Sequence, residues 1–158
     1  MLNNHQNLVL TIALAMCFKI APFPHAIRNL NPDWILLVLI YWSLALPYQQ
    51  GVFNAWAIGL LTDVLTGRSL GEHALIYALV IYVCIKLHKR LRQFPLLQQT
   101  AFILVCLLVA QIIVFWVESM RGPARFSTSF WLPVLTGTLF WPFVNPVINF
   151  IRSLGKSG

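Results

Sequence analysis

The chain has 158 residues, of which 59% are hydrophobic and 9% are charged, and its net charge is +7. Soluble domains carry about a quarter charged residues, so a soluble domain of this composition would expose apolar surface that it could not cover. The composition therefore predicts a protein of the lipid bilayer. Because no basic patch with interleaved aromatic residues is present, we assign the positive charge to membrane topology and contact with lipid head groups, and we expect no nucleic-acid partner.

Six apolar segments follow one another, separated by prolines, glycines and charges. We expect membrane spans at residues 6–22, 33–47, 51–66, 70–87, 96–118 and 127–151. A span needs about 20 residues, so the second and third segments are short, and they either form a compact hairpin or pack away from lipid. The sequence thus predicts an all-α integral membrane protein in which residues 1–158 form one polytopic domain, a compact bundle of about six transmembrane helices. Five spans are the alternative.

Polar residues mark the ends of the first two segments. Lys19, near the end of the first, can extend its ammonium group to the membrane interface. The second opens with Asn31, which suits a helix N-cap, followed by Asp33, whose charge complements the positive end of the helix dipole. Trp34 is a residue type typical of membrane interfaces. We interpret Asp33 as structural.

Small residues recur at every fourth position of the third segment, at Gly51, Ala55 and Gly59, and the spacing continues through Asp63, Gly67 and Gly71. Residues four apart share one face of a helix. Small side chains on that face allow a second backbone to approach closely, which is how helices associate in lipid. The pattern predicts close helix packing here, without showing whether the neighbouring helix belongs to this chain or another.

Asp63 falls where the third helix should end, and a carboxylate at that position is disfavoured by the helix dipole. It therefore needs a partner, and two are near in sequence: Arg68 and the first-turn amides of the next helix, up to Glu72. We favour a structural role, in which Asp63 closes the turn and caps the fourth helix. The alternative is a membrane-edge site for a cation, a proton or a ligand, with Glu72 and His73 contributing.

Topology depends on one strongly basic segment. Four of the eleven Lys and Arg residues lie between positions 86 and 92, which the positive-inside rule places in the cytoplasm as a loop. With six spans, both termini are then cytoplasmic. The last segment contains Pro133, Pro142 and Pro146 and should bend. Within the fifth segment, Gln111 can form a hydrogen bond to another helix.

No residues suggest a reaction. Cys17, Cys84 and Cys106 lie apart in apolar runs and form no Cys-x-x-Cys pair, so we interpret them as small buried hydrophobic residues. The four histidines are scattered, and no serine or cysteine has an evident base. We therefore expect no catalytic residues, no cofactor and no metal site.

Two stretches carry a family resemblance. They are the Asn-Pro-Asp-Trp entry at residues 31–34 with the apolar run to Pro47, and the Gly-Asp-Gly-Gly turn at positions 59, 63, 67 and 71. Together with residues 111–116 and 139–142, they resemble the rod shape-determining protein MreD family of bacteria. The resemblance covers nearly the whole chain.

This resemblance implies a multi-pass protein of the bacterial inner membrane that belongs to the machinery for side-wall elongation. It implies binding to MreC, and work alongside RodA, a penicillin-binding transpeptidase, RodZ and MreB. The family has no assigned catalytic residues, and its fold is thought similar to the substrate-binding membrane component of energy-coupling-factor transporters. The rival hypothesis is a substrate-binding subunit of a small-molecule transporter, with Asp63, Arg68, Glu72 and His73 around an outer pocket.

Overall fold

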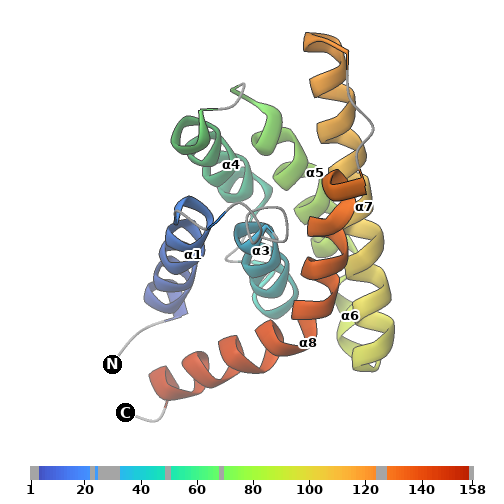
Figure 1. Cartoon of the computed structure of the whole chain (residues 1–158). Helices are drawn as coiled ribbons and strands as arrows, with labels where there is room; N and C mark the ends of the chain where they lie inside the picture. The colour runs from blue at the N-terminus through green and yellow to red at the C-terminus, as the bar shows by residue number, and fades with distance from the viewer. Residues whose placement is uncertain are drawn as a thin grey trace.

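The computed structural model describes residues 4–21, 24, 33–48, 51–67, 70–123 and 128–156. Within these ranges all regular structure is helical, as Figure 1 shows. The helices are α1 (Asn4–Ile20), α3 (Trp34–Ala45), α4 (Val52–Thr66), α5 (Glu72–Lys86), α6 (His88–Gln93), α7 (Leu96–Arg121) and α8 (Thr128–Lys156). Two residues singled out from the sequence, Asn31 and Arg68, lie outside the described ranges.

Each of the six expected segments overlaps one of the six longer helices, and one detail of the prediction was wrong. The basic segment is not a plain loop, because residues 88–93 form the short helix α6, with Leu91 buried. Helix α7 continues past position 118 to Arg121, and α8 continues past position 151 to Lys156. Helix ends fray, so their positions are the least predictable part of a helix.

Two helical stretches are long and apolar enough to cross a membrane, Leu96–Arg121 and Trp131–Leu154. The helical stretches His5–Ile20, Trp34–Ala45 and Val52–Thr66 are apolar but shorter. A helix rises 1.5 Å per residue, so the 12 residues of α3 extend about 18 Å, well short of a hydrocarbon layer of about 30 Å. Six separate spans therefore remain a prediction.

Helix α3 is the centre of the bundle. Every residue from Ile35 to Leu44 is buried, and α1, α5, α6 and α8 all pack against this helix. Its tie to α1 includes a hydrogen bond of 2.9 Å, in which the indole Nε1 of Trp42 donates to the hydroxyl of Thr11. The second segment thus packs away from lipid, as one of our alternatives held. It does not pair chiefly with α4 in a hairpin, because the main partner of α4 is α5.

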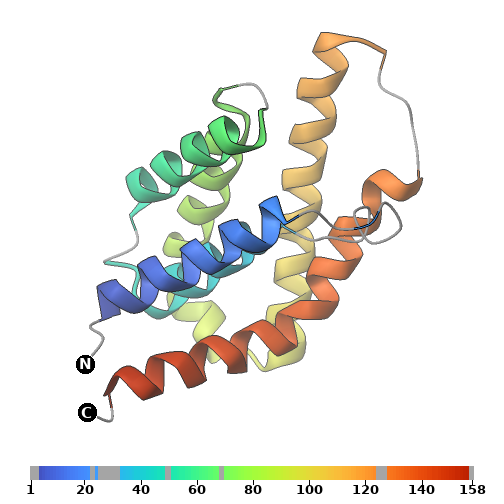
Figure 2. The ribbon, with the colours of Figure 1, turned by 60° about the vertical axis from the view of Figure 1, so that its left-hand side comes forward.

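Helix α8 bends, as its internal prolines predicted. Its first part runs beside α7, and its last part turns across the bundle toward α1 (Figures 1 and 2). Each internal proline lacks the N–H that would continue the hydrogen-bond ladder, which weakens the helix at Pro133, Pro142 and Pro146.

The molecule has two distinct ends. The start of α1, helix α6 and the end of α8 lie at one end, whereas the turn between α4 and α5 and the end of α7 lie at the other (Figures 1 and 2). This arrangement agrees with a topology in which both termini share a side of the membrane with the basic segment. The side itself is still assigned by the positive-inside rule alone.

Candidate functional site: a polar cluster between four helix ends

Ends of four helices meet in a group of polar side chains, which we call the polar cluster. Lys19 lies in the last turn of α1, Asp33 caps α3, Asp63 lies in the last turn of α4, and His73 and Tyr77 lie in the first two turns of α5. Asp63 and His73 are buried, as is Tyr77. Charged groups are costly away from water unless they are paired, so each of these polar groups needs a partner.

Asp33 is the N-cap of α3, the role expected for Asn31. Its Oδ1 accepts from the backbone N–H of Leu36 at 3.3 Å, which satisfies one of the amides that a helix start leaves unpaired. Both carboxylate oxygens also accept from the hydroxyl of Tyr77, each at 2.9 Å. The sequence interpretation of Asp33 as structural agrees with these contacts, but the cap lies two residues later than predicted.

Lys19 is paired with polar groups of α3 and α5, and its expected extension to the membrane interface stays a prediction. Its Nζ forms an ion pair with Oδ1 of Asp33 at 3.3 Å, and it lies 3.3 Å from Nε2 of His73 and 3.4 Å from the hydroxyl of Tyr77. An ammonium group has three N–H donors, and these three partners match that number. The Asp33 carboxylate compensates the cost of placing this ammonium group in a half-buried position.

Asp63 closes the turn between α4 and α5 and caps α5, which is the structural role favoured from the sequence. Its Oδ2 accepts from the N–H of Gly71 at 2.9 Å, and its Oδ1 accepts from the N–H of His73 at 3.1 Å. The chain reverses through Gly67 and Gly71, whose φ angles of 68° and 99° are left-handed. Only glycine adopts such angles readily, so the glycines let the carboxylate reach the amides of the next helix.

The bonds of His73 assign its proton. Its Nδ1 lies 2.8 Å from Oδ1 of Asp63, and its Nε2 faces the ammonium of Lys19. Since Lys19 can only donate, Nε2 acts as the acceptor, and a neutral imidazole then carries its hydrogen on Nδ1, where Asp63 accepts it. The polar cluster is therefore one continuous chain of donors and acceptors from Asp33 through Lys19 and His73 to Asp63.

The small-residue stripe of α4 packs against α5 of the same chain. A methyl group on Gly59 would lie 2.4 Å from the Cα and 2.6 Å from the backbone N of Ala74. Ala55, one turn earlier, is fully buried. The close packing expected from the spacing is present, and the neighbour left open by the sequence is α5. This contact brings the first turn of α5 against α4, where Asp63 can cap it.

The remaining candidates have separate positions. Glu72 is buried in the first turn of α5, where its charge suits the helix dipole. Trp34 packs between Phe18 of α1 and Phe140 of α8, with ring centroids 5.9 Å and 5.3 Å away, rather than standing alone at an interface. Gln111 is half-buried on α7.

Sequence reasoning left two members out of the polar cluster, Lys19 and Tyr77. Tyr77 had a detectable signal, because it lies four residues after His73 and so shares its helix face. Lys19 had none, since it lies 14 positions before Asp33 along the chain and only the packing of α1 on α3 joins them.

Within the described ranges, no group of three or more His, Cys, Asp or Glu side chains is placed to hold a metal ion.

Cys84 and Cys106 are buried as expected, but Cys17 is exposed on α1, so that prediction was wrong for one of the three thiols. The hydrogen bonds and the ion pair of the polar cluster join the ends of α1, α3, α4 and α5.

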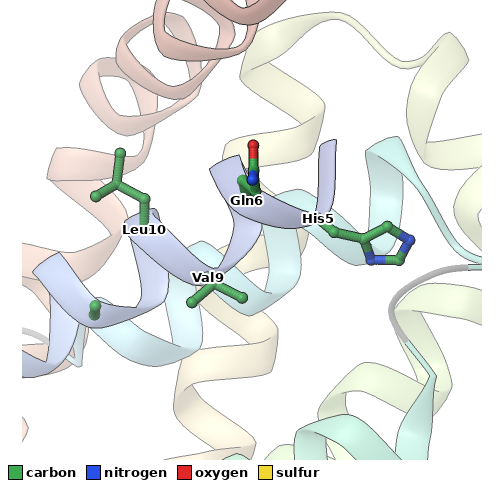
Figure 3. A pocket seen from close by; sticks show the side chains of 5 residues that line it. His5, Gln6, Val9 and Leu10 are labelled. Atoms are coloured by element: carbon green, nitrogen blue, oxygen red, sulfur yellow. The ribbon is translucent and has the colours of Figure 1, made fainter. Parts of the chain in front are cut away.

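A hollow of about 440 Å³ lies on the side of α1, lined by residues of that helix alone. Figure 3 shows His5, Gln6, Val9 and Leu10 spread around the helix rather than converging on one point. A ligand site normally has walls from several elements and a few converging polar groups. This hollow is therefore an open apolar flank of α1.

These features define a helical membrane protein whose charged and polar interior groups are used to join its own helices. The comparison with known families names the class more closely. The family model of rod shape-determining protein MreD matches residues 2–152, and the chain belongs to this family. It is 30% identical to "Rod shape-determining protein MreD" of Haemophilus influenzae over 139 residues, which cover 88% of this chain and 86% of that relative. No solved structure matches the chain significantly.

The chain is thus a rod shape-determining membrane protein. The similarity to the substrate-binding component of energy-coupling-factor transporters rests on the family resemblance alone, because no solved structure supports it. The helical fold is in keeping with that similarity but does not test it.

Proposed function

We propose that this protein is a non-catalytic, multi-pass subunit of the bacterial inner membrane that binds MreC within the cell-elongation complex and supports side-wall peptidoglycan synthesis. RodA, its penicillin-binding transpeptidase, RodZ and MreB are the further members of that complex. The observation that carries the proposal is the family match, which extends over residues 2–152 and so leaves no room for a separate domain of other function within the match.

The distribution of polar groups supports a role in assembly. Lys19, Asp33, Asp63 and His73 bond to one another, so the polar cluster offers little to an external substrate. The rest of the described surface consists largely of the sides of apolar helices. Interactions of this chain therefore take place mainly within the bilayer, by packing against helices of partners.

Helices α7 and α8 are the surfaces that we assign to a partner span. In the most apolar 18-residue stretch of each helix, only 22% of the residues are buried. Trp116 of α7 and Leu139 of α8 are about two-thirds exposed, at 65% and 66%. The small-residue face of α4 is already covered by α5, so a partner helix has to dock elsewhere. A single span laid along α7 and α8 would cover exposed apolar side chains of both helices.

The transporter hypothesis gains no support from this arrangement. It needed Asp63 and His73 to face an outer pocket, and their side chains instead bond to each other and to the turn that they close. We therefore do not carry it forward as a second function.

The first test is a pull-down in a gentle detergent, with an affinity tag on the carboxyl end and mass spectrometry of the bound proteins. Recovery of an MreC-like protein with the glycosyltransferase and transpeptidase would support the proposal. Recovery of nucleotide-hydrolysing subunits with a coupling protein would overturn it in favour of transport.

The second test locates the docking face. A photo-cross-linking amino acid is placed at Trp116, at Leu139 or, as a matched control, at Val64 of α4, which is equally exposed at 65%. We expect the MreC-like partner to cross-link at the first two positions and not at Val64. Cross-linking at Val64 alone would show that the partner docks on α4 and would refute the assignment of α7 and α8.

A further inference from the structure

A cavity of about 150 Å³ lies at the end of the bundle that contains α6, far from the polar cluster. Four helices wall it: the end of α3, helix α6, the start of α7 and the last part of α8. Its polar lining is formed by Tyr41, Arg92, Gln99, Trp141, Asn145, Asn149 and Arg152. Walls from four separate elements and a convergent set of polar groups distinguish it from the open flank of α1.

The cavity is strongly basic. Arg92 and Arg152 both line it, whereas none of the four acidic residues in the sequence does. Arg92 is held in place by the end of α3, because its guanidinium donates to the carbonyl of Leu44 at 2.6 Å and to that of Ala45. Those bonds use two of five N–H donors. The cavity therefore holds two guanidinium groups with no carboxylate between them.

Two residues that line this cavity each carry a buried donor with no hydrogen-bond partner among the described residues. The donors are Nε1 of Trp141, a residue only 1% exposed, and Nε of Arg152. A buried donor without an acceptor is costly, so such groups in a native protein usually mark the position of a missing acceptor. Both belong to residues that line the same cavity, and both donors call for an acceptor there.

We propose that this cavity binds the phosphate of an anionic phospholipid head group. A phosphate diester accepts several hydrogen bonds, carries the complementary charge and matches the planar fork of arginine. The cavity is smaller than the roughly 300–1,000 Å³ of pockets for drug-sized ligands, so it suits a compact group whose remaining atoms extend outside.

The surroundings favour a lipid over a dissolved phosphate. Phe143, Val147 and Phe150 lie on the same helix segment as Trp141 and Arg152, and all three are exposed. Their spacing places them on the side of α8 opposite to its cavity-lining residues, so the helix segment that walls the cavity has an apolar outer side suited to the bilayer. The cavity is also at the end that the basic segment assigns to the cytoplasm, where basic pockets between helices bind anionic lipid.

The test is native mass spectrometry of the delipidated protein after addition of phosphatidylglycerol, phosphatidylethanolamine or inorganic phosphate. We expect one phosphatidylglycerol to stay bound at collision energies that strip phosphatidylethanolamine. Equal retention of the two lipids would overturn the proposal, because it would show no preference for net negative charge. Binding of inorganic phosphate with no retention of phosphatidylglycerol would overturn the lipid assignment.

Matched variants separate a defined site from diffuse charge. Arg152→Gln removes a guanidinium from the cavity, and Arg90→Gln makes the same change on α6 at an exposed residue that does not line it. We expect Arg152→Gln to weaken phosphatidylglycerol binding about tenfold or more, and Arg90→Gln to have little effect. Equal losses in the two variants would show a general attraction of the basic segment and would refute the site.

A second variant keeps the test valid if Arg152→Gln fails to fold. Trp141→Phe keeps an aromatic ring at this buried position and removes the unpaired Nε1 donor together with part of the indole volume. We expect a folded protein with a somewhat lower unfolding midpoint in lipid-free detergent and with weaker phosphatidylglycerol retention. Unchanged retention in this variant, with Arg152→Gln also unchanged or misfolded, would overturn the proposal.

Discussion

The Oδ1 atom of Asp63 lies 2.8 Å from the Nδ1 atom of His73, and this bond joins the last turn of α4 to the first turn of α5. The same oxygen accepts from the backbone N–H of His73. One carboxylate thus fixes both the start of α5 and the orientation of its first polar side chain. This relationship makes the turn at residues 63–73 a structural joint.

Asp63→Asn should weaken this joint. The carboxylate accepts from two backbone amides and from the imidazole, whereas an Asn side chain has one oxygen and an N–H₂ group that would face a donor. Leaving a buried donor unsatisfied costs about 1–3 kcal/mol. We expect a lower midpoint of thermal unfolding in detergent and reduced accumulation in the membrane.

The neighbouring substitution Val64→Ala is the control, because Val64 is exposed and belongs to the same helix turn. It should leave the unfolding midpoint nearly unchanged. If Asp63→Asn kept wild-type stability but lost binding to its partners, Asp63 would be an interaction residue, and our structural assignment would be wrong.

Gly59→Ala should be severely destabilising although it adds a single methyl group. That methyl would lie 2.4 Å from a backbone atom of Ala74, so helices α4 and α5 have to move apart. Overpacking a core costs about 1–3 kcal/mol and more where backbone has to shift, so we expect a loss at the upper end of this range. Gly59→Leu should prevent accumulation altogether.

Two comparisons check this prediction. Gly51→Ala lies on the same stripe, but nothing lies within 4 Å of the added methyl, so it should be tolerated. The second change Ala74→Gly should not rescue Gly59→Ala, because the clash is with the backbone of Ala74 and not with its side chain. Rescue by that change, or normal stability of Gly59→Ala, would disprove the close approach.

Lys19 and Asp33 should be energetically coupled. Their side chains are only 16% and 24% exposed, and the ion pair between them links α1 to α3. Lys19→Met leaves the Asp33 carboxylate without its cation, and breaking a well-buried pair costs about 3–5 kcal/mol, less where water still reaches it. We expect a lower unfolding midpoint for Lys19→Met.

A double-mutant cycle with Asp33→Asn measures the coupling directly. The double variant should be more stable than the sum of the two single losses predicts, by about 1 kcal/mol or more. Strictly additive losses would show that the two side chains contribute independently, and Lys19 would then owe its position to packing.

Single cysteines should report opposite sides of the membrane at Gln93 and Gly122. Gln93 belongs to α6, and Gly122 follows the end of α7 at the other end of the molecule. In a background with Cys17, Cys84 and Cys106 replaced by alanine, a membrane-impermeant maleimide should label Gly122→Cys in intact cells. It should label Gln93→Cys only after the inner membrane is opened, because the positive-inside rule places the basic segment in the cytoplasm.

The reverse labelling pattern would invert the topology. It would place both termini outside the cytoplasm, and it would also remove the argument that puts the basic cavity beside anionic cytoplasmic lipid. Labelling of both positions from one side would show that α7 does not cross the bilayer.

The positions of the helices follow from the sequence by itself, and so does the cap at Asp63. Prolines, glycines and charges interrupt the apolar runs and so mark where helices end. Proline removes a backbone hydrogen-bond donor, and glycine permits left-handed backbone angles. The reach of Asp63 across a short glycine turn is likewise a local matter. These features depend on residues close together in the chain, so sequence reasoning could find them.

What only the tertiary structure decided is which side of each helix faces inward. In a bilayer the lipid-facing side of a helix is as apolar as the packed side, so hydrophobic periodicity carries little information about the core. For that reason the pairing of Lys19 with Asp33, the approach of Gly59 to Ala74 and the placement of Arg92 and Arg152 around one cavity could not be predicted from the sequence. Each of these joins residues of different helices, and only the packing of the helices brings them together.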